Sequence, residues 1–209
     1  PGATSDKPVR HIHSWTRREV VRDPIFWVLL TGVLAPGFIG TTIFYHQDYM
    51  AALNGWPPQL FATSLVVLSS TTVVVALITG WVIDRYGAVS VLPFFLVPLS
   101  ASCLVLSLNG PPLVLYVVMV FLGIAYGASS TLFGSLWPGI YGTVYLGSIR
   151  AVTVSAVVIA TAAGPGLTGT LIDQGITLPR QMFYLAIYCL AATVAMGVAA
   201  VFLRRRAAG

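Results

Sequence analysis

The stretch GWVIDRYG, residues 80–87, places an acid and a base side by side between two long uncharged runs. Only 8% of the 209 residues are charged, while 57% are hydrophobic and the mean hydropathy is +0.88. Soluble domains use roughly 45 to 50% apolar residues and about three times as many charges. The uncharged runs are therefore expected to lie in a membrane, and Asp84 and Arg85 to mark a turn between two of them.

The apolar residues fall into six stretches, each long enough for a helix that crosses the hydrocarbon, which takes about 20 residues. Short segments rich in glycine and proline separate them. A membrane barrel is a poor alternative, because the runs lack alternation of apolar and polar residues. We therefore predict an all-α membrane protein with six transmembrane helices, at residues 25–46, 59–83, 88–108, 112–136, 148–172 and 180–203.

The basic residues predict the orientation of these helices. With a cytoplasmic N-terminus, ten of the eleven Lys and Arg residues lie on the cytoplasmic side and only Arg180 lies outside. Both termini are therefore expected in the cytoplasm, with a basic tail at 1–23, a six-helix bundle at 24–204 and a second tail at 205–209. We interpret the basic tails as anchors beside the lipid bilayer and expect no nucleic-acid partner. The ten residues are Lys7, Arg10, Arg17, Arg18, Arg22, Arg85, Arg150, Arg204, Arg205 and Arg206.

A short motif occurs at the ends of the second and fifth predicted helices. GWVID at 80–84 and GTLID at 169–173 share Gly, Ile and Asp at the same spacing. The first motif would lie on the cytoplasmic side and the second outside. This placement predicts two inverted three-helix repeats, an arrangement common in secondary transporters.

Residues 80–87 also resemble a signature of the major facilitator superfamily, GxxxD(R/K)xG(R/K)(R/K). Gly80, Asp84, Arg85 and Gly87 fit it, whereas Ala88 and Val89 replace its trailing basic residues. That loss is typical of the C-terminal copy, so the chain, which begins at Pro1, is similar to the C-terminal six-helix half of such a carrier, nearest the bacterial branch of monocarboxylate transporters and oxalate/formate antiporters. The resemblance implies a bacterial inner-membrane location, a missing N-terminal six-helix half as partner, and transport of a small solute by alternating access.

The resemblance also implies a role for the charged motif. In the family this loop is a conformational latch, and here Gly80 would permit close helix packing while Gly87 would permit a tight reversal. Arg85 would meet the negative end of its helix, and Asp84 would face a neighbouring helix. The alternative is a plain interfacial turn, since charges are tolerated at helix ends.

The first and fourth helices of such a half line the substrate cavity, so their polar residues are candidates for substrate contact. His46 would also be a candidate for moving a coupling proton, because histidine titrates near neutral pH. Alternatively, His46 lies among headgroups and Tyr126 only bonds a neighbouring helix. The candidates are Thr41, Thr42, Tyr45, His46, Gln47, Tyr126, Ser129 and Ser130.

Three further residues have candidate roles. Arg150 could attract an anionic substrate, such as a small organic anion, or serve as a topology anchor. Pro36 and Pro165 lie inside predicted helices and are expected to bend them. No Asp, Glu, Lys or Arg is expected at mid-membrane depth, so the coupling residue of a symporter or antiporter would lie in the other half, or the carrier would be a uniporter.

Other functional classes fit the sequence less well. Ser129 lies in GASS, which is similar to the serine motif of rhomboid proteases, but no histidine is placed to activate it. Both cysteines lie in apolar runs without metal-ligand neighbours, so we expect no metal, no cofactor and no enzymatic activity. A six-helix scaffold or assembly subunit without transport stays open as an alternative.

Overall fold

A computed structural model describes residues 14–208; Lys7 and Arg10 of the predicted basic tail lie outside them. In this part of the chain the secondary structure is helical, without strands. The helices are α1 (Arg17–Arg22), α2 (Pro24–Tyr45), α3 (Gln47–Asn54), α4 (Gln59–Tyr86), the 3-10 helix η1 (Ala88–Ser90), α5 (Val97–Ser107), α6 (Leu113–Tyr141), α7 (Leu146–Asp173) and α8 (Leu178–Ala208).

Among the described residues, five helices are long and apolar enough to cross a membrane: α2, α4, α6, α7 and α8. The chain is thus a membrane-embedded helical protein. The continuous helix expected over residues 88–108 does not form. Pro93 lies in the non-helical part of this stretch and Pro98 in the first turn of α5; a continuous helix would need an amide hydrogen at both positions, which proline lacks. The chain passes through η1 and a run of turns, and only the 11 residues of α5 are α-helical.

Other helix ends also differ from the prediction. α4 continues through Asp84 and Arg85 to Tyr86, so the turn is confined to Gly87, which has a φ of 81°. α6 extends through Pro138, which was expected in a loop. α8 includes Arg205 and Arg206, which were expected in a tail; arginine and alanine favour helix, and basic residues stabilise its last turn.

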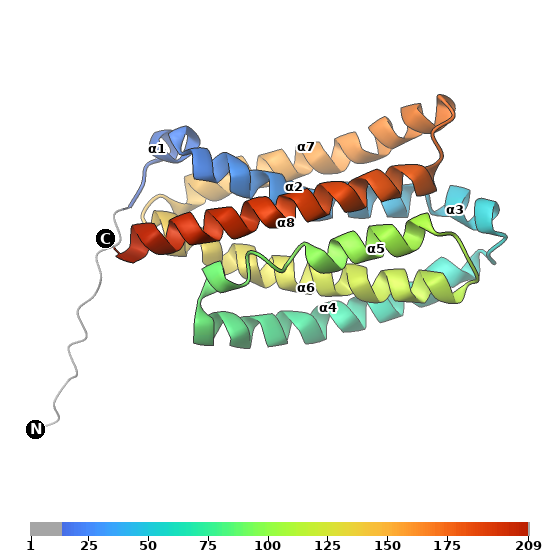
Figure 1. The fold of residues 1–209 in the computed structure, drawn as a ribbon, viewed down its shortest axis with the longest axis horizontal. Helices are drawn as coiled ribbons and strands as arrows, with labels where there is room; N and C mark the ends of the chain where they lie inside the picture. The colour runs from blue at the N-terminus through green and yellow to red at the C-terminus, as the bar shows by residue number, and fades with distance from the viewer. Residues whose placement is uncertain (1–13, 209) are drawn as a thin grey trace, which may run out of the picture.

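The long helices run side by side: α4, α6 and α8 end at the end of the bundle where α2 and α7 begin (Figure 1). α1, the turn after α4, the turn between α6 and α7, and the end of α8 lie at one end of the bundle, which we call the terminal end. The main contacts join α4 to α6, α2 to α7, α5 to both α6 and α8, and α2 to α8. α2 and α6 are the most enclosed of the five long helices, whereas α4 and α7 expose most of their apolar surface.

Glycines permit close helix crossings at two places. A Cβ on Gly127 of α6 would lie 2.5 Å from the carbonyl oxygen of Thr72 on α4. A Cβ on Gly164 of α7 would lie 2.7 Å from the carbonyl oxygen of Phe38 on α2. Small residues permit such backbone approach, and in lipid this packing is a main source of helix association.

The α4–α6 crossing gives a test of this packing. Gly127→Ala should destabilise the protein by about 1 to 3 kcal/mol, because the added methyl group meets backbone atoms that cannot move independently. Gly139→Ala on the same helix is the matched control, since a Cβ there meets nothing within 4 Å. Thermal unfolding in detergent measures both. Equal unfolding temperatures for the two variants would contradict the close approach.

Candidate functional site

The charged motif forms the last turn of α4 at the terminal end of the bundle. Gly80 faces Thr131 of α6, whose Cγ2 lies 3.8 Å from where a Cβ would stand. The Arg85 guanidinium lies 5.9 Å from the Trp81 ring centroid and 5.8 Å from that of Tyr86. Asp84 is exposed and has no hydrogen bond or ion pair within residues 14–208. Its carboxylate is therefore available to a group outside the described chain.

Two of the candidate residues on α6 face the interior of the bundle. The hydroxyl of Tyr126 lies directly over Gly40 of α2, where any Cβ would collide with it. Ser129 is only 6% exposed, and its hydroxyl has no hydrogen-bond partner among the described residues. Ser130, in contrast, is exposed and donates to the carbonyl of Gly127, 3.0 Å away.

Two candidates on α2 lie at the crossing with α7. Thr41 donates to the carbonyl of Gly37 at 2.7 Å, an ordinary helical contact. Thr42 is fully buried, and its hydroxyl has no partner among the described residues. Its Oγ1 would be 2.7 Å from a Cβ on Gly164. Thr42 and Ser129 are thus buried hydroxyls that retain their capacity to donate a hydrogen bond, which usually costs about 1 to 3 kcal/mol when unused.

The remaining three candidates lie at the other end of α2. Tyr45 is 74% exposed, and its ring packs edge-on against His46 at 5.2 Å. His46 ends α2, with its Nδ1 3.1 Å from the carbonyl oxygen of Thr42. Gln47 begins α3 and lines a separate groove of about 480 Å³ between α3 and α4. The eight candidates therefore do not surround one cavity.

Arg150, near the start of α7, has a backbone contact that explains its position. Pro138 removes the amide hydrogen that would have bonded the carbonyl of Gly134, four residues earlier. The Arg150 Nη2 donates to that carbonyl oxygen at 2.9 Å. Neighbouring side chains often satisfy carbonyls freed by proline in membrane helices. No acidic group forms an ion pair with Arg150 within residues 14–208, so most of its donors and its charge stay available.

Arg150 also borders a groove of about 380 Å³ between α2, α6 and α7 near the terminal end, which we call the Arg150 groove. Most of its wall is apolar, and the backbone contact to Gly134 holds the guanidinium at its side. A groove with this chemistry fits a small molecule that has an apolar body and one negative group. Its lining residues are Val33, Phe133, Gly134, Trp137, Arg150, Thr153, Val154, Val157 and Val158.

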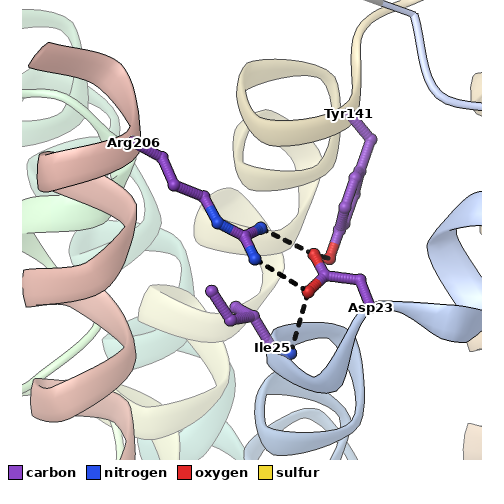
Figure 2. A network of polar contacts seen from close by, with 4 residues as sticks. All are labelled: Asp23, Ile25, Tyr141 and Arg206. Carbon is purple, nitrogen blue, oxygen red and sulfur yellow. Dashed lines mark hydrogen bonds and ion pairs between the residues drawn. The ribbon is translucent and has the colours of Figure 1, made fainter. Parts of the chain in front are cut away.

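A polar network that the sequence did not predict joins three helices at the terminal end (Figure 2). Asp23 precedes α2 and is 4% exposed. Arg206 of α8 donates to it from Nη1 and Nη2, at 2.9 and 3.1 Å. The Tyr141 hydroxyl of α6 donates to Oδ2 at 3.2 Å, and the amide of Ile25 donates to Oδ1 at 3.1 Å. Two carboxylate oxygens therefore accept four hydrogen bonds.

Aromatic rings surround this network. The Tyr141 ring stacks on Trp137 with centroids 6.2 Å apart, and it meets Trp15 edge-on at 5.5 Å. The Trp15 amide donates to the carbonyl of Tyr141 at 3.0 Å. The Arg206 guanidinium lies 5.9 Å from the Trp15 ring centroid. Trp137 also lines the Arg150 groove, so the network and the groove share a wall.

The environment of Asp23 shifts its pKa. Burial alone raises the pKa of the carboxyl group, but hydrogen bonds from Arg206 and Ile25, together with the Arg206 charge, outweigh it. The pKa therefore lies below the ordinary value of 3.8. Asp23 is ionised at neutral pH in this conformation.

Sequence reasoning overlooked Asp23, Tyr141 and Arg206 as a group. One local signal was present: an aspartate directly before Pro24 is a typical helix N-cap followed by proline at the first helical position. The partner of Asp23 on α8, 183 residues away, carries no local signal.

The lowered pKa of Asp23 predicts how stability depends on pH. A carboxylate with a lowered pKa stabilises the fold at all pH values above its unfolded pKa, and this contribution is lost as the pH falls through the folded pKa. We expect Asp23→Asn to cost about 1.5 to 3 kcal/mol, toward the lower end because Arg206 is half exposed. The deficit in unfolding temperature should stay constant from about pH 8 to about pH 5. It should shrink only near and below pH 3.8. A deficit that shrinks near neutral pH would contradict this assignment.

Comparison with known proteins gives no assignment: no family model matches the chain, and no curated protein matches it either. The family resemblance of residues 80–87 therefore stays an expectation, and a function has to be inferred from the helices and side chains described above.

Proposed function

We propose that the chain forms one six-helix half of a secondary transporter of the major facilitator type, which moves a small organic anion by alternating access. In this proposal η1 and α5 together form the third of six membrane passages. The two inverted repeats are α2, α4 and α5, and α6, α7 and α8. A second six-helix bundle supplies the other half of the carrier.

The helix contacts carry the proposal. Exchanging the repeats replaces α2 by α6, α4 by α7 and α5 by α8. The contact between α4 and α6 then becomes that between α7 and α2, and both contacts occur. The contact between α5 and α6 becomes that between α8 and α2, and both again occur. This reciprocity supports an inverted repeat of the kind on which secondary transporters are built.

The exposed surfaces support a partner bundle. α4 and α7, the equivalent second helices of the two repeats, are the least buried of the long helices. α4 exposes Ser69 and Ser70, and α7 exposes Ser155, Ala162 and Gly166. Small residues on an exposed helix face favour contact with another helix over contact with lipid. These two faces are the proposed contact with the other half.

The Arg150 groove supports an anionic cargo. Its guanidinium has no acidic partner in residues 14–208, and the contact with Gly134 restrains its position. A carboxylate would add a charge-assisted hydrogen bond to Arg150, and the apolar walls would take the rest of a small organic anion. Hydrogen-bonding capacity deeper in the bundle would come from Thr42 and Ser129, whose hydroxyls have no partner in the described part of the chain.

Orientation can be tested with single cysteines in a background in which Cys103 and Cys189 are replaced by alanine. The terminal end carries Arg17, Arg18, Arg85 and Arg150, whereas Arg180 lies near the opposite end. The positive-inside rule therefore predicts a cytoplasmic terminal end. In whole cells an impermeant thiol reagent should label Gln174→Cys and spare Ala88→Cys. Strong labelling at Ala88→Cys alone would overturn this orientation.

Transport itself is tested with the full-length polypeptide in liposomes loaded with small carboxylates. We expect counterflow of at least one carboxylate above that of empty liposomes. Asp84→Asn should slow it by about 5- to 30-fold, the effect of one to two kcal/mol on a conformational equilibrium. Substrate binding should persist. Asp173→Asn, at the equivalent position of the other repeat, is the matched control.

Two results would count against the proposal. If no carboxylate crosses faster than in empty liposomes, the anion carrier fails and the scaffold alternative gains. If Asp84→Asn transports at the unchanged rate, the motif at residues 80–87 is an ordinary turn and not a latch.

A further inference from the structure

We propose that Asp23, Arg206 and Tyr141 form an ionic lock that holds α2, α6 and α8 together at the terminal end of the bundle and so keeps the Arg150 groove narrow. This inference rests on the proposed function, because the opening of the groove is taken to be a step of the transport cycle. It assigns a conformational role to three residues that the transport motif does not include.

The position of the lock carries the first step of this inference. Asp23 lies at the start of α2, Tyr141 at the end of α6 and Arg206 in the last turn of α8, so one carboxylate holds three helix ends together. The groove lies between α2, α6 and α7, and Trp137 forms part of its wall while stacking on Tyr141. Separation of α6 from α2 at this end would therefore widen the groove and break the Tyr141 contact.

Prolines make such a separation feasible. Pro138 lies one turn before Tyr141, and it removes one backbone hydrogen bond from the segment that carries Tyr141. Pro36 lies inside α2, one turn after Val33, which lines the groove, and removes one backbone hydrogen bond there. The start of α2 and the end of α6, which carries Tyr141, are thus each attached to the rest of the bundle through a weakened helical turn, and the groove residues Val33 and Trp137 lie in these turns.

The two sides of the ion pair differ in exposure, which suits a contact that opens. The Asp23 side chain is 1% exposed and the Arg206 side chain is 47% exposed. Arg206 can exchange its partner for water or a headgroup, but a buried carboxylate without donors is strongly disfavoured. Release of the lock therefore requires water to reach Asp23, and this couples opening to hydration of the groove end.

The test measures opening by the reactivity of a cysteine at Val33, in lipid nanodiscs and in the background without native cysteines. Val33 is 7% exposed and lines the groove, so Val33→Cys should react slowly with a thiol reagent. Asp23→Asn keeps a good N-cap but removes the charge and one of the two oxygens that accept hydrogen bonds. Arg206→Gln changes only the half-exposed partner. Each should accelerate the reaction by at least about fivefold, the low end for coupled sites.

Matched controls separate the lock from general effects. Arg205→Gln removes the same charge from the same turn of α8 and should leave the Val33→Cys rate unchanged. Arg206→Lys, which keeps the charge but not the bidentate contact, should give an intermediate rate. Ser64→Cys on α4 is fully buried and reports loosening of the whole fold. Its rate should change less than the Val33→Cys rate in each of these variants, since Asp23→Asn also lowers the stability of the whole fold.

Three results would overturn the lock: unchanged Val33→Cys rates in Arg206→Gln, equal acceleration in Arg205→Gln, or parallel acceleration at Ser64→Cys. Parallel acceleration at Ser64→Cys would mean that the network stabilises the whole fold and not the groove in particular. The assay needs no substrate, so it is independent of transport. Faster Val33→Cys labelling in the variants, without carboxylate transport by the protein, would support the lock and reject the carrier. Carboxylate transport without any change in Val33→Cys labelling would support the carrier and reject the lock.

Discussion

The arrangement of the bundle depends on the close approach of α4 to α6 and of α7 to α2. Lipid tails are as apolar as the side chains they would replace, so helices in a membrane associate chiefly through tight packing. Gly127 and Gly164 place backbone against backbone at these two crossings. α2 and α6 therefore become the enclosed helices and α4 and α7 the outer ones. The same two crossings bring the polar groups of α2 and α6 into the interior.

Prolines within the helices set a second constraint, because a freed carbonyl in a membrane needs a new donor. Arg150 supplies one to Gly134, opposite the gap that Pro138 leaves. On α2, Pro36 frees the carbonyl of Gly32, and the Tyr188 hydroxyl of α8 donates to the carbonyl of Thr31 next to it. Each donor comes from a neighbouring helix, so the weakened turns are also points where helices are attached to one another. A movement at Pro138 must therefore exchange the Arg150 contact as well as bend α6.

Five membrane helices could be predicted from hydropathy because each consists of an apolar run of sufficient length. The break at Pro93 and Pro98 was missed, since hydropathy measures apolar length and not the supply of backbone amides. The candidate site shows a similar limit. The most conspicuous charged pair in the sequence, at residues 84–85, has an acid without a partner in the described chain. The buried acid is Asp23, whose partner is 183 residues away and is set by the packing of α8 beside α2.

The depth of the charged groups connects these constraints. An ion pair at the centre of a membrane must find all its hydrogen bonds in the protein, whereas one at a helix end can exchange them with water. The pair of Asp23 and Arg206 shares a feature with each case: the Asp23 carboxylate is enclosed in the protein, whereas the Arg206 side chain is half exposed. Such a pair is stable while α2, α6 and α8 stay together, and it has an aqueous alternative once they part. Among the described residues, the ion pair between Asp23 and Arg206 is the only one, and it lies at the helix ends. At this position a change of hydration can control the separation of the helices.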